Sequence, residues 1–180
     1  MLDKVARWDG EISERLRLKQ DKSINWGSAV FLAHSGDSWF WMIALANLWM
    51  LTRGFWRQWA VYMAFCIGVT ALLVFAVKFV FKRTRPPGEW GSVYRKTDPH
   101  SFPSGHATRA FLIATLAFHL GPPWLAIILI IWAPLVALAR VMTGLHFVLD
   151  VLVGALLGIL AAYLFLPFLP QLNHLLPFLF

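Results

Sequence analysis

The sequence predicts an all-α fold: a polytopic transmembrane helical bundle of five to six membrane helices, preceded by an N-terminal amphipathic helix. Of the 180 residues, 59% are hydrophobic and only 14% are charged, and the mean hydropathy is +0.64. A soluble domain is about 45–50% apolar and about 25% charged. The apolar excess lies in long uncharged runs, which excludes a disordered chain, a coiled coil and an ordinary soluble enzyme. At this length we expect one domain, residues 1–180.

The first 22 residues predict an amphipathic helix that lies on the membrane surface. Their apolar residues recur at steps of three and four, with charged residues between them: Leu2, Val5, Trp8, Ile12 and Leu16. A helix that binds a protein partner is the alternative. Residues 23–36 are an interfacial or broken lead-in, and residues 38–52 are a short span, since neither run reaches the ~20 residues of a straight crossing.

Four further helices follow from uncharged runs separated by proline, glycine and charge. They cover 59–77 with an extension to about Lys82, then 104–120, 124–142 and 146–166. Gly154 and Gly158 give the last of these a small-residue face for close helix contact. The intervening segment 83–104 predicts a loop outside the hydrocarbon, with Trp90 and Tyr94 either lining an entrance or anchoring it at the interface.

This alternation brings three polar clusters to the same membrane face. In the first, Lys78 and Arg85 are seven residues apart, so they share a helix face if the helix persists that far. Charges deep in an apolar helix are usually functional or paired, although snorkelling to the interface is the alternative. For Lys82 and Arg83 we expect snorkelling.

The second cluster, Pro103-Ser104-Gly105-His106, opens a helix. The first helical turn presents unpaired N–H groups and a positive dipole end, which favour an anion. Ser104 suits the N-cap position, and Gly105 allows an oxyanion to approach the backbone closely. An N-cap alone would not explain His106 beside it.

The third cluster is Arg140-x5-His146-x3-Asp150. His146 and Asp150 are four residues apart on a helix, so the carboxylate can accept a hydrogen bond from one imidazole nitrogen. Such a bond fixes the tautomer and raises the basicity of the other nitrogen. A lone buried histidine is usually structural, but a His–Asp pair with a facing arginine favours a functional site.

A metal site is the alternative for this constellation, with four candidate ligands: His100, His106, His146 and Asp150. Three cations that converge on one point repel a metal and attract a phosphate instead. These are Lys78, Arg85 and Arg140. We therefore expect no metal and no cofactor.

In order, the three clusters resemble the type 2 phosphatidic acid phosphatase superfamily, whose pattern is Lys-x6-Arg-Pro, Pro-Ser-Gly-His and Ser-Arg-x5-His-x3-Asp. The resemblance covers residues 78–150 and departs at Ala139, where the family often has serine. The stretches 100–110 and 140–146 look most similar to small isoprenoid-diphosphate and lipid A 1-phosphatase members.

The resemblance implies a membrane lipid phosphatase that works through a phosphohistidine. His146 would be the nucleophile, with Asp150 holding it basic, and His106 would protonate the leaving oxygen. The phosphate would be held by Lys78, Arg85, Arg140 and the N–H groups of Ser104 and Gly105. The expected substrates are lipid A 1-phosphate, phosphatidylglycerol phosphate, phosphatidic acid or an isoprenyl diphosphate. A non-catalytic anion-binding or transport protein of the membrane is the alternative.

The net charge of +7 could indicate nucleic-acid binding. We expect none, because Lys and Arg at membrane borders anchor helix ends and meet anionic lipids. If residues 1–37 do not cross the membrane, all Lys and Arg residues except Arg53 and Arg57 lie on the side of the three clusters. The positive-inside rule would then put that side in the cytosol. Several of these cations belong to the phosphate site, however. The resemblance implies a bacterial inner membrane protein whose active site faces away from the cytoplasm.

Overall fold

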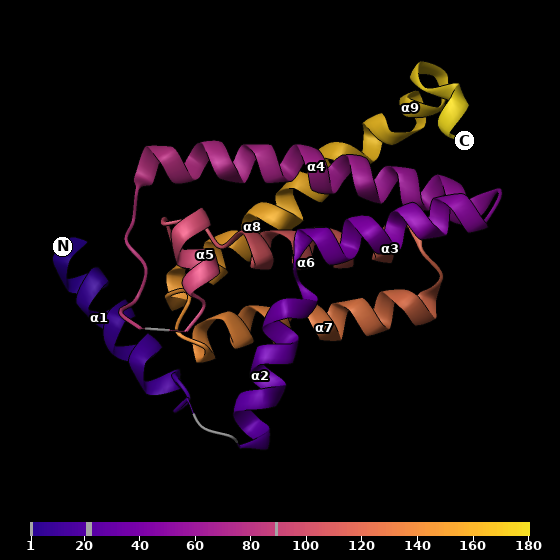
Figure 1. Ribbon diagram of the computed structural model, residues 1–180. Helices are drawn as coiled ribbons and strands as arrows, with labels where there is room; N and C mark the ends of the chain where they lie inside the picture. Colours follow the sequence, from indigo (N-terminus) through magenta and orange to yellow (C-terminus); the bar gives the residue numbers. More distant parts are fainter. Residues whose placement is uncertain (1, 21–22, 89) are drawn as a thin grey trace.

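The predicted all-α architecture is confirmed in the computed structural model, which describes residues 2–20, 23–88 and 90–180. The main helices are α1 (Leu2–Leu16), α2 (Ile24–Ser35), α3 (Ser38–Leu51), α4 (Phe55–Phe81), α5 (Ser92–Thr97), α6 (Gly105–Leu120), α7 (Pro123–Met142) and α8 (Val148–Phe165). A short C-terminal tail follows, made of η1 (Leu166–Phe168), α9 (Leu169–Leu175) and η2 (Pro177–Leu179). Figure 1 shows this tail extending away from the end of the bundle that carries α1.

Three helical stretches in the described part of the chain are long and apolar enough to cross a membrane: Phe55–Phe81, Pro123–Met142 and Val148–Leu175. The apolar helix α3 is shorter, and α6 has 16 residues. The predicted reversal after α6 is confirmed, since Gly121 caps α6 and Pro122 precedes α7. Within its described residues, the predicted loop 83–104 contains one short helix, α5.

Helix α6 is the centre of the bundle and contacts α4, α7 and α8. Its residues Leu112, Ile113 and Leu116 are fully buried. The predicted small-residue face of α8 packs against it: a Cβ added to Gly154 would lie 2.6 Å from the carbonyl oxygen of Ser104, and one added to Gly158 would overlap the next turn of α6. This close approach fixes α8 against the start of α6, where the second polar cluster lies.

The predicted N-terminal helix is confirmed as α1, although residues 1 and 21–22 of the predicted segment lie outside the described residues. Its apolar Val5, Trp8 and Leu16 are exposed, as expected for a helix that turns them to a membrane. Two polar residues beside this apolar stripe, Asp9 and Ser13, are buried instead and cap α8. Asp9 Oδ1 accepts a hydrogen bond from the Leu149 N–H at 3.0 Å, and Ser13 Oγ accepts one from the Val148 N–H at 2.9 Å. These bonds satisfy N–H groups that have no partner within the first turn of α8, and they tie the N-terminus to the third polar cluster.

Candidate active site

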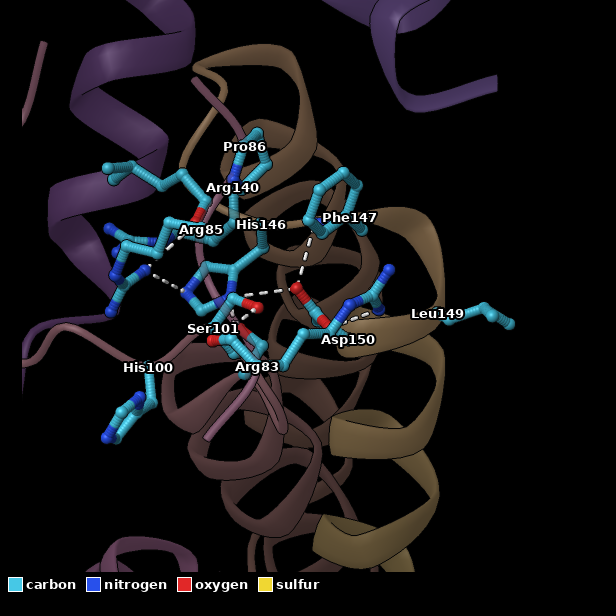
Figure 2. A network of polar contacts seen from close by, with 12 residues as sticks. Arg83, Arg85, Pro86, His100, Ser101, Arg140, His146, Phe147, Leu149 and Asp150 are labelled. Atoms are coloured by element: carbon cyan, nitrogen blue, oxygen red, sulfur yellow. Dashed lines mark hydrogen bonds and ion pairs between the residues drawn. The ribbon is translucent and has the colours of Figure 1, made fainter. Parts of the chain in front are cut away.

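His146 lies in the turn between α7 and α8, and the first and third polar clusters meet at its ring (Figure 2). Its Nδ1 is 2.8 Å from the carbonyl oxygen of Ser101, and its Nε2 is 3.1 Å from Arg85 Nη1. A carbonyl can only accept and a guanidinium can only donate. The hydrogen-bond network therefore assigns the proton to Nδ1 and leaves a lone pair on Nε2, facing the cation.

Asp150 does not accept the hydrogen bond that the spacing of four residues predicts. Its Oδ2 is 3.7 Å from His146 Nδ1, so that part of the prediction is wrong and the Ser101 carbonyl takes this role instead. Asp150 is fully buried and accepts hydrogen bonds from the Phe147 N–H at 2.9 Å and from Arg83 at 2.7 Å. Its charge still lies close enough to stabilise a positive imidazole ring.

Arg83 was expected to snorkel, and this expectation is wrong. Its guanidinium bridges two fully buried carboxylates, with Nη1 2.7 Å from Asp150 Oδ1 and Nη2 2.6 Å from Asp9 Oδ2. It also lies 4.2 Å from the ring centre of Phe147. Lys82, the neighbouring residue, is exposed, so only one of the two adjacent cations belongs to the polar network around His146.

Lys78 and Arg85 converge as predicted, but not along one helix face. Helix α4 ends at Phe81, and Lys82 follows it in the left-handed conformation with φ of 46°, so Arg85 reaches the site from the loop. Both cations contact Asp98: its Oδ2 lies 2.8 Å from Lys78 Nζ and 2.9 Å from Arg85 Nη2. Sequence analysis did not select Asp98, whose oxygen lies where two cations could hold a phosphoryl oxygen.

Arg140 is fully buried beside Arg85 and His146 (Figure 2). Its guanidinium lies 4.7 Å from the ring centre of Tyr94, and its Nη1 is 3.5 Å from the carbonyl oxygen of Ala33. Within the described part of the chain, its Nε and Nη2 have no hydrogen-bond partner. Leaving buried donors unpaired is costly, and this favours an anion as their partner.

The predicted N-cap of α6 is confirmed at Ser104. The prediction that the Ser104 N–H is free to bind an anion is not met. Ser104 Oγ accepts the Ala107 N–H at 3.4 Å, as expected for an N-cap. The Ser104 N–H, however, donates to the main-chain oxygen of Asp150 at 3.0 Å, so it already has a partner within the protein. Gly105 and His106 open the helix, where N–H groups have no intrahelical acceptor.

His106 has a carboxylate partner that sequence analysis missed. Asp37, the N-cap residue of α3, places Oδ1 2.6 Å from His106 Nε2. The same carboxylate accepts the Tyr94 hydroxyl at 2.8 Å, so Tyr94 belongs to the polar network rather than to an entrance. The available signal was that Asp37 is the single Asp, Glu, Lys or Arg between residues 23 and 52.

A cavity of about 250 Å³ between α4 and α6 joins the two histidines. Its polar end is lined by Lys78, Asp98, Gly105, His106 and His146, and apolar side chains continue it along the two helices. Among the described residues, no three His, Cys, Asp or Glu side chains are grouped to hold a metal ion. His100 lies apart from the other candidate ligands, with its ring against Phe79 at 5.6 Å.

The local field keeps His146 neutral. Burial lowers the pKa of its imidazole well below the usual value, and the cations Arg85, Arg140 and Lys78 lower it further. Burial alone would raise the pKa of Asp37, but the hydrogen bonds from His106 and Tyr94 outweigh it and hold the pKa below the usual range. Burial and the bond to Asp37 raise the pKa of Tyr94 to about 12, so its hydroxyl stays a donor.

Known proteins are similar to this chain in sequence and in fold. An undecaprenyl-diphosphatase of Sulfolobus acidocaldarius is 30% identical over 151 residues, which cover 82% of this chain and 72% of that protein. A lipid A 1-phosphatase of Porphyromonas gingivalis is 38% identical over 96 residues, 51% of this chain and 20% of the relative. The crystal structure of a transmembrane PAP2-type phosphatidylglycerolphosphate phosphatase from Bacillus subtilis superimposes with a TM-score of 0.70 and 26% identity, covering 96% of this chain and 88% of that one.

The sequence model of the PAP2 superfamily matches residues 59–173. That range contains all three polar clusters, and its helices carry the cavity between α4 and α6. The chain therefore belongs to the PAP2 superfamily and is an integral-membrane enzyme of the lipid phosphate hydrolase type.

Proposed function

We propose that the chain hydrolyses a phosphate ester or diphosphate of a membrane lipid in two steps, through a phosphohistidine at His146. The observation that carries the proposal is the state of this imidazole. It is buried, it is neutral, its Nδ1–H is held by Ser101, and its Nε2 lone pair faces Arg85. A nucleophile needs this combination of an unprotonated nitrogen and a fixed orientation.

In the first step His146 Nε2 attacks phosphorus, and the bond to the lipid oxygen breaks. The electron pair of that bond goes to the leaving oxygen, which takes a proton from His106. The ring of His146 becomes positive as its bond to phosphorus forms. The Ser101 carbonyl at 2.8 Å and the Asp150 carboxylate at 3.7 Å stabilise this charge. In the second step His106 takes a proton from water, and the water oxygen attacks the phosphorus. The bond between phosphorus and Nε2 of His146 breaks, its electron pair returns to the ring, and phosphate is released.

We assign binding of the phosphoryl oxygens to Lys78, Arg85 and Arg140 and to the N–H of Gly105. The orphan donors of Arg140 support this assignment, as does the convergence of Lys78 and Arg85 on one oxygen of Asp98. Ser104 contributes the helix cap rather than a donor to phosphate. Fixed cations stabilise charge on the transferring group without a metal ion, so we expect the reaction to be metal-independent.

We propose that residues 1–180 act as one unit in the membrane, because α1 and the α2–α3 turn supply Asp9 and Asp37 to the polar network. The apolar continuation of the cavity between two membrane helices supports a lipid substrate. Lipid A 1-phosphate, phosphatidylglycerol phosphate, phosphatidic acid and isoprenyl diphosphates are the candidates. We propose a bacterial inner membrane location with the site on the extracytoplasmic side, as the family resemblance implies.

Phosphate release from these four lipids by the purified protein in detergent, with EDTA present, tests the proposal. We expect release with at least one lipid, and complete loss in His146→Ala. In His106→Ala we expect a loss of ~10²–10⁴-fold on lipid esters but a smaller loss on p-nitrophenyl phosphate, whose leaving group needs no proton. Equal losses in both variants on every substrate would contradict the separate roles. Lipid phosphate binding without any release would indicate the non-catalytic alternative.

A further inference from the structure

Arg109 is a buried cation that the reaction described above does not use. It lies on α6, three residues after His106, is 8% exposed, and lines the same cavity as the two histidines. Its Nη1 donates to the carbonyl oxygen of Gly36. Within the described part of the chain, its Nε has no hydrogen-bond partner. A charge at this depth in a membrane protein is costly and usually functional.

A second unpaired polar atom lines this cavity. Thr70 on α4 is 5% exposed, and its hydroxyl has no hydrogen-bond partner among the described residues. Helices α4 and α6 contact each other along the cavity, so Arg109 and Thr70 are on facing walls. Two orphan groups on opposite walls of one cavity indicate a polar ligand group between them.

The position of Arg109 identifies which part of a ligand it would meet. Helix α6 begins with Gly105, which lines the polar end of the cavity, and it continues from there to Leu120. At a rise of about 1.5 Å per residue, Arg109 lies roughly 4.5 Å beyond His106 on the same side of the helix. If His146 takes the terminal phosphorus and His106 faces the leaving oxygen, the next group of the substrate lies beside Arg109.

We propose that Arg109 and Thr70 form a second anion subsite, which binds the lipid-linked phosphate of a lipid diphosphate. The proposal rests on the proposed function. As the bond between Nε2 of His146 and the terminal phosphorus forms, the P–O bond of the bridging oxygen breaks. Its electron pair stays with the departing lipid monophosphate. The guanidinium of Arg109 stabilises the charge that grows on that phosphate, and the apolar Ile67, Ala71 and Leu112 beyond it contact the chain.

The alternative is that Arg109 only anchors the α2–α3 turn. By holding Gly36, it keeps Asp37 against His106. Loss of that anchor would disturb His106 and slow the hydrolysis of every substrate. Loss of a diphosphate subsite would slow diphosphates alone. Two substrates with the same tail and one or two phosphates therefore separate these roles.

The experiment compares farnesyl diphosphate with farnesyl monophosphate on the full-length protein in detergent. The variant is Arg109→Gln, because glutamine can still donate to Gly36 but carries no charge. We expect kcat/KM for the diphosphate to fall ~10- to 100-fold, the usual scale for a charged hydrogen bond, and kcat/KM for the monophosphate to change less than about threefold. Thr70→Val should cause a smaller loss of the same selectivity. Thr115→Val is its control, since the Thr115 hydroxyl is already bonded to Phe111 within α6.

Parallel losses on both substrates, or no loss on either, would overturn the subsite. If Arg109→Gln does not fold, inhibition of the wild-type protein tests the subsite instead. Methylenebisphosphonate should inhibit at least tenfold more strongly than orthophosphate. Equal inhibition by the two anions would refute the proposal. Absence of phosphate release from any lipid by the wild-type protein would instead contradict the proposed function, so the two failures are distinguishable.

Discussion

Removal of the Arg83 side chain is the sharpest test of how this site is held together. Arg83 touches no predicted phosphate ligand, yet its two terminal nitrogens contact Asp9 and Asp150 at 2.6 and 2.7 Å. Both carboxylates are fully buried, and Asp150 lies 3.7 Å from the His146 ring. In Arg83→Ala two buried carboxylates would lose their shared cation.

The expected loss of folding stability depends on the hydrogen bonds that each carboxylate keeps in this variant. Breaking a buried ion pair by removing one partner costs about 3–5 kcal/mol. Here the Arg83 side chain is 26% exposed, and each carboxylate retains one main-chain donor, Leu149 for Asp9 and Phe147 for Asp150. We therefore expect the lower end, about 3 kcal/mol, which at 2–4 °C per kcal/mol corresponds to a Tm lower by about 6–12 °C.

Thermal unfolding in detergent and kcat/KM on one lipid substrate measure the effect. The matched control is Lys82→Ala, which removes the adjacent, exposed cation and should leave both quantities near wild type. Arg83→Lys should be intermediate, because a point charge cannot bridge two carboxylates as a planar fork does. Adding Asp9→Asn to Arg83→Ala removes one uncompensated charge and should recover part of the Tm. If Arg83→Ala behaves like Lys82→Ala, the bridging arrangement is wrong.

Two further predictions concern the histidines. Burial and the neighbouring cations lower the pKa of His146, so the nucleophile stays neutral as the pH falls through its ordinary value of about 6.5. The acid limb of kcat/KM should therefore lie below that pH, and a limb centred above pH 7 would contradict the proposed role. Asp37→Asn replaces the carboxylate that contacts His106. We expect kcat to fall ~10- to 100-fold on lipid esters and less on p-nitrophenyl phosphate. An equal loss of kcat on both substrates would indicate a purely structural effect.

The helices and the meeting of the clusters could be predicted because they follow from local pattern. Uncharged runs bounded by proline, glycine and charge mark the spans, and the order of the spans brings residues 78–85, 103–106 and 140–146 to one end. Gly154 and Gly158 predicted a close helix contact because small residues have few other uses at that spacing. Each of these inferences needs only the sequence separation and the helical period.

The site features that could not be predicted depend on contacts between segments far apart in the sequence. Helical periodicity carries no information about such contacts. Ser101 orients His146 through a main-chain oxygen, and every residue has one, so the sequence carries no mark of it. Asp9 looked like one charge of a surface helix, but its side of α1 is buried against α8. Arg83 looked equivalent to Lys82 because the turn that separates them in space begins only where α4 ends.

The different partners of the two histidines support their different proposed roles. Asp37 contacts His106 directly at 2.6 Å, and a carboxylate at that distance partly offsets the cost of placing a positive charge on this buried ring. His146 instead donates to the neutral carbonyl of Ser101, while its carboxylate is 3.7 Å away and shared with Arg83. That arrangement holds the ring in place but stabilises its charged form less. The nucleophile thus keeps its lone pair until a bond to phosphorus forms, and the acid beside it is the histidine with the closer carboxylate.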